Sequence, residues 1–355
     1  MSKMAAVAVQ NGQISNIDVD MPVPAAGQVL VKSLACGICG SDLHIARHGE
    51  EVFEIYKKMG VLPEDLPSSA PIMLGHEFCA EVVSYGPQTL PRFAPGTRVT
   101  CAPILLTQGG AGVGVTPGLN GAYSEYFILD AELLLEVPAH LSSLAVTITE
   151  PLAVGVHAVN RAEIDRDCVA LVAGCGTIGL ATIAALKHLG VKEIVASDLQ
   201  ASKREVAEQF GALYTLDPSQ DDEVKFTSDL AQGRRVVIFE CVGIHQLLNG
   251  FIERAPANST LVITGVHTAM TQVNFGYATV KEMDIKFSYY YSVEEFATAL
   301  QMLASGDIAW EKMCTATVGM DGIAEAFNTL LKPNDHIKVI LEPGRQGALT
   351  PFHHD

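Results

Sequence analysis

A glycine-rich turn between an apolar run and a helix constrains the fold of this chain more than any other stretch. The apolar run at residues 168–173 has the uninterrupted character of a strand that is buried on both faces of a parallel sheet. Gly174, Gly176 and Gly179 follow it directly in the spacing G-x-G-x-x-G, and a helical pattern begins behind them. Glycines in this spacing permit a tight turn and let a pyrophosphate approach the amides at the helix start.

An acidic residue completes the pattern of a dinucleotide-binding unit. Asp198 ends the next predicted strand, 19 residues after Gly179. A carboxylate there accepts hydrogen bonds from the adenosine ribose hydroxyls and repels a 2′-phosphate, so the pattern favours NAD over NADP. The alternative is a glycine-rich turn between strand and helix that binds no ligand. The glycine turn, its spacing and the acidic residue Asp198 together favour a bound dinucleotide.

The chain changes character near residue 165. Before this point the pattern is β-rich and irregular, whereas strands and helices alternate after it, which is typical of a parallel sheet with helices on both faces. A chain of 355 residues also exceeds one typical core. We therefore predict an α/β protein of two domains. A β-rich domain comprises residues 1–154 and 292–355, a doubly wound domain comprises residues 155–291, and residues 344–355 form a disordered tail.

The composition excludes several kinds of partner. With 48% hydrophobic and 18% charged residues the chain is of the folded, globular type, and its net charge of −17 argues against binding to nucleic acid. The first residues lack the pattern of a signal peptide. Two long uncharged stretches, residues 99–124 and 168–186, contain several glycines, which argues against reading them as membrane spans. We expect a cytoplasmic protein without a membrane span.

The 8 cysteines are scattered through apolar runs, which predicts buried thiols rather than disulfides.

A second stretch, residues 36–44, concentrates chemically versatile side chains. It holds two thiols, a hydroxyl, a carboxylate and an imidazole: Cys36, Cys39, Ser41, Asp42 and His44. By itself this stretch is compatible with a metal-binding loop, a redox thiol pair or an ordinary turn. His76-Glu77 and Glu150 are further candidates, although each of them alone is more often structural.

Taken in order, these motifs resemble the zinc-dependent medium-chain dehydrogenase/reductase family. The resemblance rests on Cys39-Gly-Ser-Asp-Leu-His44, on Gly75-His76-Glu77, on the stretch from Glu150 to His157 and on the glycine motif. It covers nearly the whole chain and is greatest to the branch of polyol (sorbitol), butanediol and threonine dehydrogenases. It implies a GroES-like β-rich domain that holds one catalytic zinc ion, and a Rossmann domain that binds NAD.

The resemblance also implies the zinc ligands. Cys39 and His76 would bind the ion, and Glu150 would occupy the position of the third ligand, directly or through water. Glu77 would be the neighbouring carboxylate that enters or leaves the metal shell, and Asp42 would orient His76. A catalytic zinc needs three protein ligands and an open position, and this set can supply them.

The reaction implied by the resemblance is metal-assisted oxidation of an alcohol. Zinc acts as a Lewis acid that lowers the pKa of the substrate hydroxyl. The proton would leave through Ser41, the nicotinamide ribose and His44, while hydride passes to the nicotinamide. The cofactor contacts that we expect are Gly174, Gly176, Thr177, Ile178, Gly179, Asp198 and Lys203, with Val242, Val266, Ser288 and Tyr289 near the nicotinamide.

The chain departs from the family in two places. Cys101 stands alone where the family's structural zinc lobe needs four closely spaced cysteines, so we expect no structural zinc. Cys36 matches no ligand of the family, and we interpret it as a buried thiol. The segment between His44 and His76 is longer than usual. We expect either part of a substrate-cleft wall or a self-packed surface excursion from its apolar residues, Phe53, Tyr56, Met59 and Leu62.

Three consecutive tyrosines bear on the identity of the substrate. Residues 289–291 read Tyr-Tyr-Tyr where polyol enzymes have Phe-Arg-Tyr, and the absence of the arginine favours a secondary alcohol or diol over a polyol or threonine. A different class, a zinc-free enone or quinone reductase or a non-catalytic dinucleotide-binding protein, lacks the zinc ligands that this chain retains. We expect a homodimer or homotetramer that acts on a small-molecule alcohol.

Overall fold

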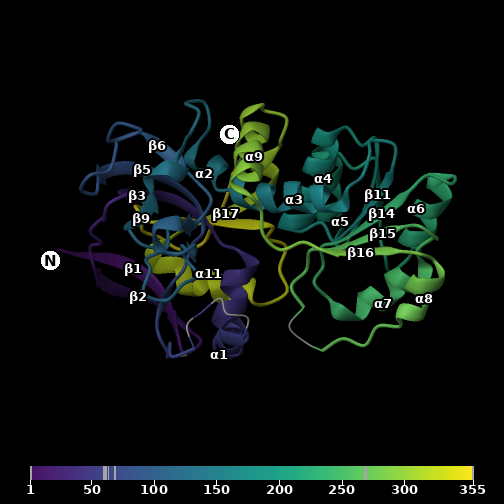
Figure 1. Cartoon of the computed structure of the whole chain (residues 1–355), viewed down its shortest axis with the longest axis horizontal. Coiled ribbons are helices and arrows are strands. Elements are labelled where there is room, and N and C mark those ends of the chain that lie inside the picture. The colour runs from purple at the N-terminus through teal and green to yellow at the C-terminus, as the bar shows by residue number, and fades with distance from the viewer. Residues whose placement is uncertain (1, 59–61, 63, 68, 268–269, 354–355) are drawn as a thin grey trace. The chain divides into compact units, whose positions relative to one another are not determined.

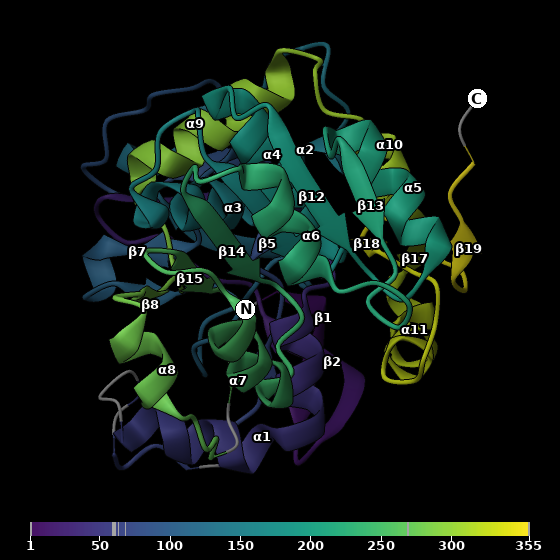
Figure 2. The same ribbon diagram turned by 90° about the vertical axis from the view of Figure 1, so that its right-hand side faces the viewer.

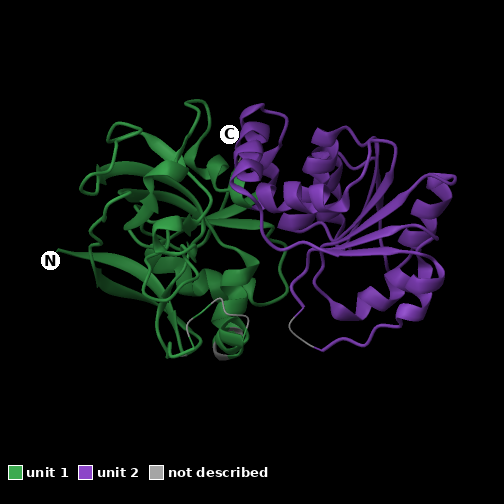
Figure 3. Cartoon of the chain, viewed as in Figure 1, with its two compact units in different colours: residues 1–150, 314–355 green, residues 151–313 purple. Residues whose placement is uncertain are grey.

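The computed structural model describes residues 2–58, 62, 64–67, 69–267 and 270–353. The chain divides into two compact units, Met1–Glu150 with Cys314–Asp355 and Pro151–Met313 (Figure 3). Among the helices within the described ranges, none combines the length and the apolar character needed to cross a membrane.

The boundary after the second unit differs from the sequence-based one. Residues 292–313 belong to the second unit, whereas we expected the chain to return to the first unit at residue 292. The physical reason is a polar contact of Glu295, which lies on a helix in this segment. Its carboxylate accepts a hydrogen bond from the Asn160 side-chain amide at 2.7 Å and lies 2.8 Å from Nδ1 of His157, both in the second unit.

The first unit is built mainly from antiparallel strands. An eight-stranded sheet has the order β10-β6-β5-β3-β18-β17-β19 with β9 also paired to β3, and a smaller sheet has the order β2-β1-β4 (Figure 1). Its strands are β1 (Lys3–Gln10), β2 (Gln13–Asp20), β3 (Gln28–Gly37), β4 (Ile72–Met73), β5 (Glu77–Tyr85), β6 (Arg98–Thr100), β7 (Ile104–Leu105), β8 (Ala111–Gly112), β9 (Tyr126–Asp130), β10 (Leu135–Glu136), β17 (Cys314–Gly319), β18 (Lys338–Glu342) and β19 (Thr350–Pro351). Its helices are α1 (Gly40–Lys58), α2 (Ser143–Val146) and α11 (Ile323–Leu330), with short 3-10 turns η1 (Leu106–Gln108), η2 (Ala131–Leu133) and η3 (Met320–Gly322).

Strand β3 sets the register that positions the candidate site. It pairs antiparallel with β5, which places Gly37 opposite Glu77. On its other side it pairs antiparallel with β18, where Gly37 lies opposite Ile340. The end of β3, the start of β5 and the start of β18 therefore lie close together, although they are far apart in the sequence.

Two segments of the first unit differ from the sequence-based prediction. Helix α1 begins at Gly40, so Ser41, Asp42 and His44 lie on its first turns, whereas a loop or a turn was considered for this stretch. The predicted disorder of residues 344–355 is wrong for the described part of that segment. Its backbone gains partners there, because β19 pairs with β17 and the Phe352 amide donates to the Thr315 carbonyl at 3.1 Å.

The second unit is a doubly wound sheet, as predicted. All pairings in the order β13-β12-β11-β14-β15-β16 are parallel. The strands are β11 (Val169–Ala173), β12 (Glu193–Ser197), β13 (Tyr214–Leu216), β14 (Val236–Glu240), β15 (Thr260–Ile263) and β16 (Asp284–Phe287). The helices are α3 (Thr149–Ala162), which begins at the unit boundary, α4 (Thr177–Leu189), α5 (Ala201–Phe210), α6 (Glu223–Ala231), α7 (His245–Arg254), α8 (Phe275–Val280), α9 (Val293–Ala304) and α10 (Trp310–Met313).

Helices cover both faces of this sheet. Figure 1 shows α3 and α4 on one side and α7 and α8 on the other, and Figure 2 shows the strands from β15 to β13 side by side. The central strands β11 and β14 are completely buried, which explains the unbroken apolar sequence of β11 and the apolar residues 236–239 that precede Glu240 in β14. Strand order reverses between β11 and β14, and ligands of such sheets bind outside the carboxyl ends of the strands at this point.

Candidate active site

Three potential metal ligands converge where β3 ends and β5 begins. The Cys39 sulfur, a ring nitrogen of His76 and a carboxylate oxygen of Glu77 all lie within 4.8 Å of one another. Cys39 stands between β3 and α1, His76 directly precedes β5, and Glu77 is the first residue of β5. A thiolate, an imidazole and a carboxylate are ligands that zinc accepts. The register of β3 against β5 thus assembles a set of candidate metal ligands in the first unit.

A buried carboxylate, Asp42, faces the imidazole of His76. Its Oδ2 accepts hydrogen bonds from the Cys39 amide at 3.0 Å and from the Tyr123 hydroxyl at 2.9 Å. Its Oδ1 lies 3.5 Å from Nδ1 of His76, and within the described chain neither of these two buried atoms has a hydrogen-bond partner. On the other side of the ring, Nε2 lies 3.3 Å from the Ser41 hydroxyl. An imidazole that turns Nδ1 toward a carboxylate keeps Nε2 for a metal, so this arrangement fits a bound ion.

The electrostatic environment of this set attracts positive charge. Burial opposes a charged His76, but Asp42, Cys39 and Glu150 outweigh it and raise the pKa of His76 well above its ordinary value. Burial also opposes the charged form of Asp42, and it therefore raises the pKa of the Asp42 carboxyl. A divalent cation in the same place would meet the same negative groups, and they would stabilise it for the same reason.

A buried lysine, which the sequence-based prediction missed, contacts the same set. The Lys338 ammonium donates to both carboxylate oxygens of Glu77, at 2.7 and 2.6 Å, and to the Ile38 carbonyl at 3.1 Å. Burial opposes the charge of Lys338, but Glu77 and the nearby Cys39 and Glu150 outweigh it and raise the pKa of the lysine. The only hint in the sequence is a single charge that opens the apolar run of β18.

Glycine is required at the position opposite Glu77. A Cβ added at Gly37 would lie 2.0 Å from Oε2 of Glu77. The absent side chain of Gly37 therefore leaves the room in which the Glu77 carboxylate meets Lys338.

Glu150 interacts electrostatically with the site but is not one of the three clustered ligands. It lies in the first turn of α3, is 7% exposed, and acts electrostatically on both His76 and Lys338. The set of ligand atoms within 4.8 Å of one another consists of Cys39, His76 and Glu77 among the described residues.

The two proposed relay residues both lie on α1. The Ser41 hydroxyl contacts His76, as described above, whereas the His44 ring lies 5.0 Å from the His48 ring, measured between centroids. Burial and the neighbouring His48 lower the pKa of His44. Within the described chain its Nε2 is buried and has no hydrogen-bond partner. The lowered pKa favours the neutral imidazole, and a neutral imidazole has one ring nitrogen that can accept a proton.

Cys36, Cys101 and the long segment between His44 and His76 behave as structural elements. Cys36 is fully buried, as predicted, and burial raises its pKa well above the ordinary value. Cys101 is also buried. Phe53 and Leu62 are 3% and 5% exposed, which favours the self-packed excursion over a cleft wall. Met59, predicted to belong to the same apolar group, lies outside the described residues.

In the second unit, the three glycines form the close turn that their spacing predicts. Gly174 has a left-handed φ of +93°, and a Cβ at Gly179 would lie 1.8 Å from the Gly174 carbonyl oxygen. A Cβ at Gly176 would have no neighbour within 4 Å, so the backbone there is open to a ligand. Thr177 and Ile178 begin α4 directly behind this opening, where helix amides favour a phosphate.

Asp198 lies beside this turn at the end of β12. Its carboxylate accepts hydrogen bonds from the Cys175 amide at 2.9 Å and from the Gln200 amide at 2.9 Å. Arg204, which the sequence-based prediction missed, donates to the Asp198 carbonyl at 2.6 Å and lies 3.5 Å from the Asp217 carboxylate. The predicted contact Lys203 precedes it on α5 and is half-buried.

The four residues predicted near the nicotinamide follow three neighbouring strands. Val242 follows β14, Val266 follows β15, and Ser288 and Tyr289 follow β16. Val242 and Val266 are 40% and 63% exposed, and Tyr289 is 64% exposed. Ser288 is buried, and its hydroxyl has no hydrogen-bond partner within the described ranges. These residues share the carboxyl edge of the parallel sheet, as a dinucleotide site requires.

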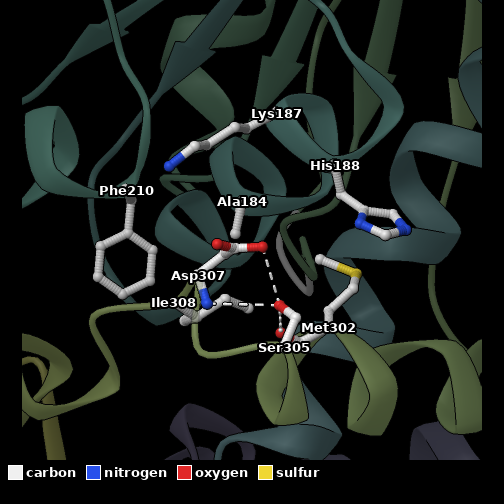
Figure 4. Close-up of a pocket in the computed structure, with 8 residues that line it drawn as sticks. All are labelled: Ala184, Lys187, His188, Phe210, Met302, Ser305, Asp307 and Ile308. Carbon is white, nitrogen blue, oxygen red and sulfur yellow. Dashed lines mark hydrogen bonds between the residues drawn. The ribbon is translucent and has the colours of Figure 1, made fainter.

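A separate hollow of the second unit contains none of the predicted site residues. It lies among the C-terminal ends of α4, α5 and α9 and the segment after α9 (Figure 4). Its lining residues are Ala184, Lys187, His188, Phe210, Met302, Ser305, Asp307 and Ile308. The Ser305 hydroxyl donates to the Met302 carbonyl at 2.8 Å, so the end of α9 shapes this hollow.

Comparison with known proteins supports the two-part organisation. Residues 25–139 match the model of the alcohol dehydrogenase GroES-like domain, and residues 177–305 match that of the zinc-binding dehydrogenases. These matches and the similar structures confirm the predicted combination of a GroES-like domain with a Rossmann-like parallel sheet.

Curated relatives and solved structures cover nearly the whole chain. The (R,R)-butanediol dehydrogenase of Bacillus subtilis (strain 168) is 31% identical over 337 residues, which are 92% of this chain and 95% of the relative. The sorbitol dehydrogenase of Bos taurus is 29% identical over 328 residues, which are 88% of each chain. The crystal structure of the Bacillus subtilis 2R,3R-butanediol dehydrogenase has a TM-score of 0.82 at 30% identity and covers 96% of this chain and 99% of its own. A Sinorhizobium meliloti 1021 structure described as a zinc-binding dehydrogenase bound to NADP has a TM-score of 0.82 at 28% identity and covers 97% of this chain and 100% of its own.

Proposed function

Because the chain belongs to the zinc-dependent medium-chain dehydrogenase/reductase family, we propose that it oxidises a secondary alcohol or diol to a ketone, reversibly, with zinc and NAD. The chain is an oxidoreductase of the alcohol dehydrogenase type. The observation that carries the proposal is the convergence of Cys39, His76 and Glu77 beside the buried Asp42.

The proposed metal ligands are Cys39, His76 and Glu150, with Glu77 as the carboxylate that can enter the shell. A bound zinc ion would supply a Lewis acid that lowers the pKa of the substrate hydroxyl. Asp42 orients His76, and Lys338 holds Glu77 back by donating to both of its oxygens. We propose that each chain binds one zinc ion at this site and no structural zinc ion.

The proposed proton path uses Ser41 and His44. The Ser41 hydroxyl would take the proton from the substrate hydroxyl, and the nicotinamide ribose would pass it to His44. Two observations support these roles: Ser41 contacts His76, and the lowered pKa of His44 leaves its imidazole neutral and able to accept.

The proposed cofactor is NAD, which would accept hydride from the substrate carbon. Asp198 supports this choice, because a carboxylate beside the glycine turn can accept the ribose hydroxyls. A nearby arginine can instead accommodate a 2′-phosphate. Here Arg204 is already engaged by the Asp198 carbonyl and by Asp217, which favours NAD. One similar structure is described as bound to NADP, so both NAD and NADP belong in the test of cofactor preference.

Among substrates, we propose a secondary alcohol or diol first and a polyol of the sorbitol type or threonine second. The tyrosines at positions 289–291 support a less hydrophilic substrate, and the Tyr290 and Tyr291 rings stack with their centroids 4.6 Å apart. Butanediol and sorbitol dehydrogenases are both among the relatives, so both substrate types belong in the experiment.

We also propose that the chain forms a homodimer or homotetramer in the cytoplasm. The sheet of the second unit ends at β16, where Phe287 is 68% exposed, and Phe275 and Val280 of α8 are 60% and 86% exposed. An unpaired strand edge with apolar neighbours favours association. All eight cysteines are free thiols, which supports a reducing compartment.

The test combines metal analysis with a substrate panel. We expect wild-type protein to contain zinc and to produce NADH from secondary alcohols or diols, read by absorbance. Cys39→Ala should lose both zinc and activity, whereas the control Cys36→Ala should retain zinc. Unchanged activity in Cys39→Ala together with no bound zinc would instead support a zinc-free reductase. Absence of activity on the whole panel with intact NADH binding would support a non-catalytic dinucleotide-binding protein.

A further inference from the structure

The end of β14 carries a buried carboxylate that no predicted role uses. Glu240 is 0% exposed, and its Oε1 accepts hydrogen bonds from the amides of Val242 at 2.9 Å and Gly243 at 2.7 Å. A buried carboxylate that accepts several N–H groups is a strong and directional anchor. Glu240 therefore fixes the backbone of the loop that leaves β14.

The same residue also holds the loop that leaves β15. The Glu240 carbonyl accepts hydrogen bonds from the Thr264 amide at 3.0 Å and the Thr264 hydroxyl at 2.7 Å. Its Oε2 lies 3.1 Å from Nε2 of His267. Because the carboxylate can only accept, Nε2 is the protonated ring nitrogen. Nδ1 of His267 is buried and has no hydrogen-bond partner within the described residues, so Glu240 is the polar contact that fixes this ring there.

The two loops are packed against each other around this contact. A Cβ at Gly265 would lie 2.6 Å from the Gly243 Cα and 2.8 Å from Oε2 of Glu240. Gly243 also adopts a left-handed φ of +76°. Neither loop can shift toward the other without a clash, so their mutual position is set by Glu240 and by the absence of side chains at the two glycines.

This packing turns two apolar side chains outward at the ligand edge of the sheet. Val242 and Val266 belong to the two loops and are 40% and 63% exposed, whereas Glu240 is fully buried. The carboxyl ends of β14 and β15 lie on the far side of the switch point from β12, which Asp198 directly follows. A dinucleotide bound across this edge would place its adenosine half at Asp198 and its nicotinamide half at the two loops.

We propose that Glu240 and His267 are positioning residues that hold the loops after β14 and β15 in the conformation that binds the nicotinamide half of the dinucleotide. This inference rests on the proposed dinucleotide binding. It assigns the two residues no contact with the reacting atoms. Their effect is to keep Val242 and Val266 in place, so it falls on the nicotinamide half and not on the adenosine half.

The test compares two ligands on the full-length, zinc-loaded protein. NADH carries both halves, and ADP-ribose lacks the nicotinamide. In Glu240→Gln the remaining oxygen can still accept from the Val242 and Gly243 amides, but an amide nitrogen replaces the oxygen that faces the protonated Nε2 of His267. In His267→Asn the ring is absent. We expect the Kd for NADH, measured by fluorescence titration, to rise about tenfold or more in each variant, as for the loss of a hydrogen bond to a charged group. The Kd for ADP-ribose, measured by calorimetry, should change less than about twofold.

The controls are Glu253→Gln and His188→Asn, which replace exposed residues of the same unit and should leave both Kd values unchanged. His267→Asn keeps the test valid if Glu240→Gln fails to fold. Equal weakening of NADH and ADP-ribose, or unchanged binding of both, would overturn the inference while leaving the proposed function intact. A wild-type protein that binds no NADH would overturn the proposed function together with this inference.

Discussion

The Lys338 ammonium lies 2.7 and 2.6 Å from the two carboxylate oxygens of Glu77, and the side chains are 1% and 0% exposed. This pair joins the first residue of β18 to the first residue of β5. It also lies directly against the candidate metal ligands, because Glu77 is one of the three clustered groups. The charge of Glu77 is therefore balanced by the protein itself, without a metal ion.

Replacing Lys338 by Met should destabilise the zinc-free protein. The Glu77 carboxylate would remain buried without its partner, and breaking a buried pair costs about 3–5 kcal/mol. We expect the free energy of unfolding in urea to fall by this amount. Lys338→Arg, which retains the charge, is the control, and the double variant Lys338→Met/Glu77→Gln should recover much of the loss. Equal stability of Lys338→Met and wild type would show that the pair contributes nothing net.

Replacing Asp42 by Asn should weaken zinc binding. The carboxylate faces Nδ1 of His76, and loss of such a partner lowers metal affinity about 10–100-fold. Competition with a chromophoric chelator measures the effect. Tyr123→Phe removes only the hydroxyl that donates to Asp42, so its affinity should fall less. Wild-type affinity in Asp42→Asn would argue against an orienting role for this residue.

Replacing Asp198 by Ser should reduce the preference for NAD. The variant removes the charge that repels a 2′-phosphate and the acceptor for the ribose hydroxyls. We expect the ratio of kcat/KM for NAD to that for NADP to fall about tenfold or more, as for loss of a charged hydrogen bond. Glu205→Gln, an exposed change on α5, is the matched control. A ratio that does not move would place the source of cofactor preference elsewhere.

Asp222 should stabilise the start of α6 in a pH-dependent way. Its side chain accepts a hydrogen bond from the Lys225 amide at 3.0 Å, and this bond, followed by Arg254, lowers the pKa of Asp222. Asp222→Ala should lower the free energy of unfolding by about 1 kcal/mol at neutral pH, as for loss of an N-cap.

The sign of the pH effect follows from the lowered pKa of Asp222 in the folded protein. Its contribution is present above the unfolded pKa of about 4 and is lost as pH falls through the folded value. The difference between wild type and Asp222→Ala in urea unfolding should therefore narrow on acidification below about pH 4. Asp229→Asn on the same helix is the control. A difference that stays constant down to pH 3 would contradict the assignment.

The elements of the second unit could be predicted because their signals are local. The alternation of strands and helices predicted after residue 165 is present in the structure, from β11 and α4 to β16 and α9. A buried parallel strand requires an unbroken apolar run, and Gly190 and Gly211 follow α4 and α5 as caps with positive φ. The first unit was harder to predict, since its short strands are stabilised by partners that are distant in sequence. The segment at residues 350–351 becomes a strand only because β17 offers it an edge.

By itself, the sequence determined the residue types of the site: a thiol, an imidazole and carboxylates near the ends of predicted strands, and a glycine turn followed by an acid. Only the tertiary structure decided which of them meet. The register of β3 against β5 and β18 brings Cys39, His76 and Glu77 together and seals Lys338 against Glu77. The contact of Glu240 with His267 likewise depends on the order of β14 and β15. Ligand chemistry is a property of single residues, whereas proximity and burial depend on strand pairing across the whole chain, which spacing along the sequence does not encode.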